Sequence, residues 1–266
     1  MNNIQIAQDT MRITKEKRYL ANGREVAFDD LDVSAVIVIT PDMGKELIAM
    51  DRSSYDLGRM CEISVVNDDS FNASIGLTKP LVMNFANAHK AGGGFLSGAK
   101  AQEEALCRTS TLYASINSGK ASEMYRYNNT HLSKVESDYM LISPEVLVFR
   151  GEGFMLLEAP YKVGVITAPA PNKYGAAMMA GAALIDETFE RRTRIICAAA
   201  ARYGFRSLVL GAWGCGAFGN DPVRVSEIMR QVIVDEGYGR CFEEIRFAIY
   251  GREDGRNITA FRKTFS

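Results

Sequence analysis

The sequence predicts an α/β fold: a three-layer α/β/α domain around a mixed, largely parallel central sheet, with an N-terminal helical extension. Two observations support this prediction. Short apolar, β-branched segments recur from residue 61 toward the end of the chain. Segments with the apolar spacing of amphipathic helices separate several of them. Strands that alternate with helices are typical of a mainly parallel sheet covered by helices on both faces.

The size and charge of the chain narrow the classes of protein to consider. Its 266 residues suit one large domain with a sizeable core. The 31 Lys and Arg residues against 32 Asp and Glu residues leave a formal net charge of -1. This balance argues against general binding to nucleic acid or to an anionic membrane surface. A polyanionic ligand would have to be held locally, by loops and helix ends.

Histidine and cysteine usage bears on metals and on the compartment. The two histidines exclude a histidine-rich metal site, and the five cysteines form no CxxC pair. We therefore expect no metal and a reducing compartment. The N-terminus has no apolar signal core and no segment approaches a membrane span, so we expect a cytoplasmic protein without membrane partners.

The first 60 residues are predicted to form an extension packed on the core. The apolar spacing near the N-terminus indicates an amphipathic helix, and Asn22-Gly23 between apolar arms indicates a hairpin. Residues 34–40, SAVIVIT, form a candidate strand. Thr40 and Pro41 then have the pattern of a helix N-cap followed by proline in the first turn.

Residues 61–266 are predicted to form the core domain. Gly204 and Gly237 stand where helix C-caps belong. Residues 127–145 form the longest polar interruption, which we expect to run over the surface. The predicted strands are 61–67, 80–85, 145–150, 162–169, 206–213 and 244–250, and the clearest helices are 102–116, 184–204 and 221–237.

A glycine triplet followed by neighbouring carboxylates is the first candidate site. Gly92-Gly93-Gly94 follows a buried strand, and Gln102-Glu103-Glu104 opens a predicted helix. Successive glycines can expose several N–H groups to one side, a nest for phosphate or sugar oxygens. A carboxyl group held partly away from water can stay protonated and act as a general acid. The structural alternative is a flexible loop followed by glutamates that the helix dipole favours.

A second glycine-rich loop, GAWGCGAFGNDP, begins at Gly211. A buried strand precedes it and a helix N-terminus follows, an arrangement suited to binding a diphosphate. The loop matches G-x-G-x-x-G, but too few residues follow for a dinucleotide-binding domain. Cys215 could be a nucleophile, although a small residue in a tight loop is the better interpretation. Phe218 could stack on a sugar or base, or belong to the core.

Together the two loops resemble those of the bacterial-type poly(ADP-ribose) glycohydrolases of the macrodomain superfamily. The signature is the glycine triplet followed by Gln-Glu-Glu, and the similarity covers nearly the whole chain from about residue 60. It includes VVNDDSFNAS, PLVMNFANA, SPEVLVFRG and VITAPAPN, and IAQDTMRITKEKRY resembles the N-terminal extension of this group. The resemblance implies a macrodomain fold.

The resemblance also implies roles for individual residues. Glu104 matches the catalytic acid that contacts the ribose–ribose linkage, and Glu103 matches the neighbour that helps to hold the distal ribose hydroxyls. Gln102 matches a residue that supports the loop, and Asn87 matches the ribose-contacting asparagine. By analogy Asn67 or Asp68 would touch the adenine. The loops that enclose the diphosphate match Gly92, Gly93, Gly94, Gly214, Cys215, Gly216, Ala217 and Gly219, and Phe218 matches the aromatic that presses the distal ribose into place.

The activity that the resemblance implies is hydrolysis of the 1″–2′ ribose–ribose bond of poly(ADP-ribose), with Glu104 as general acid and base, ADP-ribose as product and no cofactor. The substrate would be poly(ADP-ribose) or an ADP-ribosylated macromolecule, cleaved from chain ends. Alternatives are removal of mono-ADP-ribose, deacetylation of O-acetyl-ADP-ribose, and a macrodomain that binds ADP-ribose without cleaving it. The adjacent Glu103 and Glu104 favour catalysis over simple binding.

Overall fold

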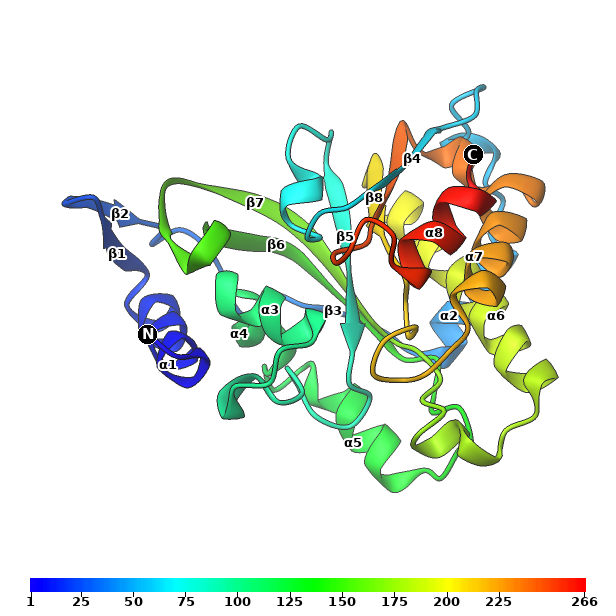
Figure 1. The fold of residues 1–266 in the computed structure, drawn as a ribbon, viewed down its shortest axis with the longest axis horizontal. Coiled ribbons are helices and arrows are strands. Elements are labelled where there is room, and N and C mark those ends of the chain that lie inside the picture. Colours follow the sequence, from blue (N-terminus) through cyan, green and yellow to red (C-terminus); the bar gives the residue numbers. More distant parts are fainter.

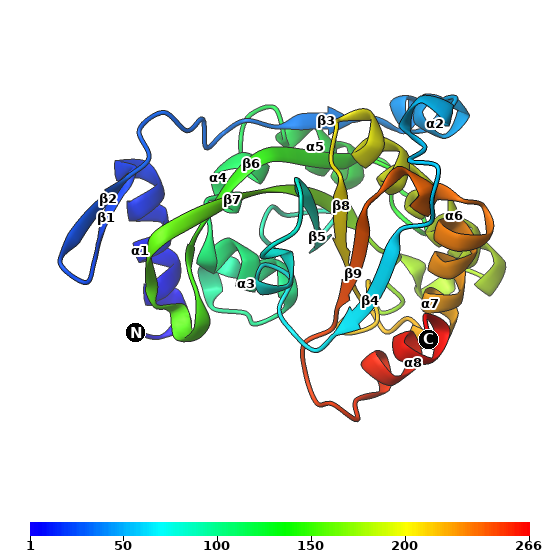
Figure 2. The same cartoon turned by 90° about the horizontal axis from the view of Figure 1, so that it is seen from above.

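The computed structural model describes residues 1–266 and places a seven-stranded sheet between two layers of helices (Figures 1 and 2). The predicted α/β/α class is confirmed. The strands of this sheet are β3 (Ile37–Ile39), β4 (Glu62–Val66), β5 (Pro80–Ala86), β6 (Met140–Arg150), β7 (Leu156–Pro169), β8 (Ser207–Leu210) and β9 (Glu244–Ala248).

The sheet is mixed and mainly parallel. Its strand order is β3-β6-β7-β5-β8-β9-β4. The strands from β7 to β4 pair in parallel, whereas β6 is antiparallel to both of its neighbours. Because parallel strands end at the same edge, the loops that follow β5 and β8 leave the sheet side by side. Ligands of open α/β sheets bind at this carboxyl edge.

Each face of the sheet has its own apolar core. In β5, Leu81 and Met83 join one cluster, while Val82 between them joins the other. This alternation follows from the period of two in a β-strand. The first cluster is covered by α2 (Pro41–Ala49), α6 (Ala182–Arg202), α7 (Pro222–Arg230) and α8 (Arg256–Thr264), and the second by α3 (Gln102–Thr109), α4 (Leu112–Ile116) and α5 (Ser122–Thr130) (Figures 1 and 2).

The N-terminal helix and hairpin form as predicted, at one end of the molecule (Figure 1). Helix α1 (Asn3–Glu16) is followed by β1 (Arg18–Ala21) and β2 (Arg24–Ala27), which pair around Asn22-Gly23. Both turn residues have the positive φ that a tight hairpin turn requires. Thr40 caps α2 as expected. Strand β3 belongs to the central sheet and α2 to one of its helical layers, so the structure shows no break in the chain at residue 60. The domain boundary at this residue stays a prediction.

Two local predictions were wrong, one of them only in part. Residues 102–116 are not one helix, because α3 ends at Thr109 and Ser110 is extended and bridges to Val148 of β6. Residues 127–145 run over the surface only in part, at 129–134, where every residue is exposed. Helix α5 runs to Thr130, β6 begins at Met140, and Val135 and Tyr139 between them are buried. Because the segment is mostly polar, its sequence did not indicate that Val135 and Tyr139 are buried. No helix is long and apolar enough to cross a membrane.

Candidate active site

Gln102 fixes the start of α3 against the sheet. Strand β5 pairs with β8 only as far as Val82, although it continues beside β7 to Ala86. Beyond Val82 the Gln102 side chain forms the hydrogen bonds with the β5 backbone that a neighbouring strand would otherwise form. Its Nε2 donates to the Met83 carbonyl (2.7 Å) and its Oε1 accepts from the Phe85 amide (2.9 Å). The two carboxylates that follow Gln102 are therefore held at the carboxyl edge of β5.

Glu103 is a buried carboxyl group with protein donors on both oxygens. The amide of Asn87 donates to Oε2 (2.9 Å), and Nδ2 of Asn84 lies 3.3 Å from Oε1. Burial raises the pKa of Glu103 to about 8, and the charge of Glu104 adds to this rise, while hydrogen bonds from Asn87, Asn84 and the Gly92 amide oppose it. The surroundings of Glu103 therefore favour its protonated form.

Glu104 has one free oxygen in a buried setting. Its side chain is enclosed, its Oε1 accepts from the Gly94 amide (2.9 Å), and its Oε2 has no hydrogen-bond partner. Both glutamates lie in the first turn of α3, where no side chain caps the helix. The positive end of the helix dipole therefore acts on the pair. Among the oxygens of the two glutamates, Oε2 of Glu104 is the one without a hydrogen-bond partner in the protein.

The glycine triplet wraps the two carboxylates. Gly92 and Gly93 have positive φ, and a Cβ on Gly93 would lie 2.6 Å from Oε1 of Glu104 and 3.2 Å from Oε2 of Glu103. Two of its amides have protein acceptors: Gly93 donates to the Lys90 carbonyl, and Gly94 donates to Oε1 of Glu104, while the Gly92 amide acts to lower the pKa of Glu103. The amides of Gly93 and Gly94 therefore already have acceptors within the protein, and the contact of the glycine triplet with a substrate stays a prediction.

The second glycine loop does present free donors. The amides of Gly214, Gly216, Ala217 and Phe218 have no acceptor in the protein, and Gly216 and Ala217 are exposed. Gly214 and Gly219 have the positive φ that turns the chain there. This backbone can receive an anion, with the N-terminus of α7 next along the chain. Its contact with a diphosphate stays a prediction.

Contacts with the β7–α6 connection hold this loop in place. Nδ2 of Asn220 donates to the carbonyls of Pro171 (2.8 Å) and Gly214 (3.0 Å). The Lys173 amide donates to the Phe218 carbonyl (3.0 Å), and the Tyr174 ring lies against Gly219. The loop is thus a braced element.

The side chains of Cys215 and Phe218 are both partly buried in the protein. Burial raises the pKa of the Cys215 thiol to about 12, which keeps it protonated and argues against a nucleophile. Phe218 is partly buried and packs against the larger apolar cluster. Its predicted contact with a ribose would involve the part of the ring that stays accessible.

Three residues that are predicted to contact the substrate come directly after β4 and β5. Oδ1 of Asn87 accepts from the amides of His89 and Lys90, and its Nδ2 has no acceptor in the protein. Asn67 bonds to Gly251 and to Glu253 in the β9–α8 connection, and Asp68 accepts from the Asp69 amide. Asn67 and Asp68 thus stabilise loops at this edge, and their contact with adenine stays a prediction.

Sequence reasoning missed residues that support the site from a distance. Asn84 bridges Glu103 and Thr167, and its position as a lone amide within the apolar run PLVMNF was a usable signal. Thr10, Arg108 and Arg150 form a buried group that links α1, α3 and β6. No local pattern marks them, because they are far apart in the sequence.

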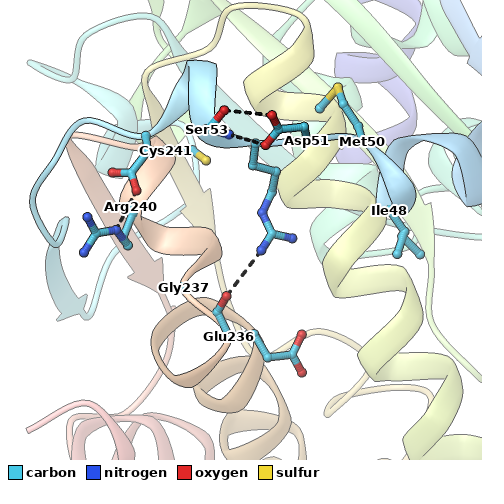
Figure 3. Close-up of a pocket in the computed structure, with 10 residues that line it drawn as sticks. Ile48, Met50, Asp51, Ser53, Glu236, Gly237, Arg240 and Cys241 are labelled. Atoms are coloured by element: carbon cyan, nitrogen blue, oxygen red, sulfur yellow. Dashed lines mark hydrogen bonds and ion pairs between the residues drawn. The ribbon is translucent and has the colours of Figure 1, made fainter.

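A separate cavity of about 480 Å³ lies near the start of β4 and β9, away from the glycine loops (Figure 3). Arg52 stacks on Tyr238, with its guanidinium 3.6 Å from the ring centre, and Arg240 pairs with Asp56 (2.7 Å). The cations that line this cavity already have protein partners. No group of three or more His, Cys, Asp or Glu side chains in the chain could hold a metal ion.

The sheet order, the two helical layers and the loops at its carboxyl edge define a macrodomain-like α/β protein with an acidic pair at the candidate site. Residues 7–151 match the family model described as microbial-type PARG, catalytic domain, where PARG denotes poly(ADP-ribose) glycohydrolase. The chain belongs to this family.

Solved structures agree with this assignment. The chain is similar to poly(ADP-ribose) glycohydrolase from Thermomonospora curvata, with 35% identity over 98% of both chains and a TM-score of 0.90. The same enzyme bound to the inhibitor ADP-HPD matches with 34% identity over 98% of both chains and a TM-score of 0.88. The Deinococcus radiodurans enzyme in complex with ADP-ribose matches with 34% identity over 87% of this chain and 94% of that chain, with a TM-score of 0.79. No curated protein sequence matches the chain.

Proposed function

We propose that this protein hydrolyses the 1″–2′ ribose–ribose bond of poly(ADP-ribose) and releases ADP-ribose. The observation that carries the proposal is the buried, unpartnered Oε2 of Glu104, next to the glycine triplet at the carboxyl edge of the sheet. Membership of the microbial-type PARG family and the similarity to glycohydrolases from two bacteria support the choice of substrate.

In the proposed reaction Glu104 donates its proton to the leaving 2′ oxygen of the bond. Positive charge develops on the distal ribose as the bond breaks, and the substrate diphosphate and the carboxylate stabilise that charge. Water then attacks the anomeric carbon and returns a proton to Glu104. Glu103, adjacent in the chain, would hold the distal ribose hydroxyls through lone pairs that its protein donors leave free.

The free amides from Gly214 to Phe218 would bind the diphosphate. This backbone site agrees with the near-neutral charge of the chain, since no basic patch is needed. We infer cleavage from chain ends on the basis of the family resemblance. The five free cysteines support a reducing, cytoplasmic location.

The test is release of ADP-ribose from purified poly(ADP-ribose) by the wild type, Glu104→Gln and the control Glu152→Gln, which changes an exposed glutamate. We expect Glu104→Gln to lower kcat by roughly 10²- to 10⁴-fold, the range of general acid catalysis, and Glu152→Gln to act like the wild type. Calorimetry should show that both variants bind ADP-ribose.

Other outcomes would contradict the proposal in distinct ways. Binding of ADP-ribose without release by the wild type would indicate a reader or a mono-ADP-ribose hydrolase. Full activity of Glu104→Gln would remove Glu104 from the mechanism. The lengths of the remaining polymer chains decide the mode of cleavage, because cleavage from ends yields ADP-ribose without intermediate fragments.

A further inference from the structure

Arg108 is a buried cation without a carboxylate partner. It lies on α3, is 2% exposed, and its Nε and Nη1 have no hydrogen-bond partner. No ion pair of the structure includes it, and its closest aromatic ring, that of Phe154, lies 5.9 Å from Cζ. A buried charge without an ion-pair partner destabilises the folded protein, so packing alone does not explain an arginine at this position.

Glu104 supplies the matching feature one turn earlier on the same helix. Residues four apart share a helix face, and the side chain of the later residue leans over the preceding turn. Arg108 and Glu104 are therefore neighbours on one face of α3, and Oε2 of Glu104 is also buried and unpartnered. Burial lowers the pKa of Arg108, and the nearby charge of Glu104 opposes that shift.

Helix α1 fixes Arg108 at this position. Oγ1 of Thr10 donates to the Arg108 carbonyl (2.7 Å) and accepts from Nε of Arg150 (3.4 Å), and Arg150 also pairs with Asp9. Arg150 is therefore neutralised, whereas Arg108 is not. The other titratable groups around this part of α3 are Glu103 and Cys107 on the helix itself, Asp9 on α1, Tyr113 on α4, Tyr125 on α5 and Arg150 on β6.

We propose that Arg108 is a positioning residue that stabilises the ionised form of Glu104 during the reaction. The inference rests on the proposed function. When the proton of Glu104 passes to the leaving oxygen and the bonding electron pair stays on that oxygen, a carboxylate remains in a buried site. The guanidinium one turn behind offsets this charge and keeps its own proton throughout. When water bonds to the anomeric carbon, its proton returns to Glu104.

The test compares Arg108→Met and Arg108→Lys with Arg150→Met, a matched loss of a buried arginine from the same region. We expect Arg108→Met to lower kcat by about 10-fold or more, with KM and the Kd of ADP-ribose nearly unchanged, and Arg108→Lys to recover most of the rate. Loss of a cation raises the pKa of a neighbouring acid. The alkaline limb of the kcat profile should therefore move to higher pH in Arg108→Met, but not in Arg150→Met.

Several results would overturn the inference. These are an unchanged kcat, an unshifted alkaline limb, or an equal effect in Arg150→Met. Because Arg108→Met could fail to fold, a double-mutant cycle gives a second measurement. Arg108→Lys and Arg108→Gln are each combined with Glu104→Gln, and the thermal stability of each double variant is compared with that of its single variants. Coupling between positions 104 and 108 supports the proposal, and strict additivity contradicts it. An inactive wild type would refute the proposed function instead, which separates the two failures.

Discussion

At the scale of single residues, Gly93 shows how little room surrounds the reacting carboxylates. Its φ of +51° is in the left-handed region, and any Cβ there would collide with Oε1 of Glu104. We expect Gly93→Ala to lower kcat by roughly 100-fold, since a displacement of about 1 Å can have that effect, and to destabilise the fold by about 1–2 kcal/mol. Gly119→Ala is the control, because a Cβ there meets open space. Equal activities of the two variants would contradict this explanation of the triplet.

At the scale of elements, α1 acts as a brace for the catalytic helix. It contacts α3 through Thr10, and Nδ2 of Asn3 donates to the Gly98 carbonyl (3.1 Å) beyond the glycine triplet. Thr10→Val keeps the shape of the side chain but leaves the Arg108 carbonyl without a donor. We expect a loss of about 1–3 kcal/mol in the free energy of unfolding, measured by urea denaturation, and a lower kcat. Thr130→Val, at an exposed position on α5, is the comparison. An unchanged stability of Thr10→Val would show that the brace is unimportant.

At the scale of the whole molecule, Glu103 links the site to the pH dependence of stability. Its folded-state pKa of about 8 lies above the ordinary value of 4.5. Between these values the folded chain keeps a proton that the unfolded chain has lost, so stability falls as the pH rises from about 5 to 8. Glu103→Gln should remove this decline and be relatively more stable at pH 8. Unfolding curves of wild type and variant at pH 5.5, 7 and 8.5 test this, and parallel trends would contradict it.

How far the sequence could predict this molecule depends on the range of each interaction. The hairpin at Asn22-Gly23 and the cap at Thr40 were predictable, because turn and cap chemistry is local. The neighbouring carboxylates at the start of α3 were equally visible. The hydrogen bond from Asn84 to Glu103 was not, since it depends on how β5 and α3 pack, and the bond from Thr10 to Arg108 spans 98 residues.

Backbone direction was also beyond sequence reasoning. A run of glycines permits many conformations, so the triplet could have offered its amides to a ligand or to the protein. In the structure the amides of Gly93 and Gly94 donate to the protein, to the Lys90 carbonyl and to the buried carboxyl group of Glu104. In the second loop the amides of Cys215 and Gly219 have acceptors within the loop, whereas those of Gly214, Gly216, Ala217 and Phe218 have none. Glycine-rich sequence therefore leads to different backbone hydrogen bonding in the two loops.

The free donors of the second loop belong to the main chain, and this affects how the protein tolerates sequence drift. Exchanging the side chain of Cys215 or Ala217 leaves every N–H in place, and only proline deletes one outright. Most point mutations in the loop can act only indirectly, by reshaping the backbone around Gly214 and Gly219. An anion site built in this way is robust to side-chain turnover, and is lost mainly through insertions, deletions or changes of backbone conformation.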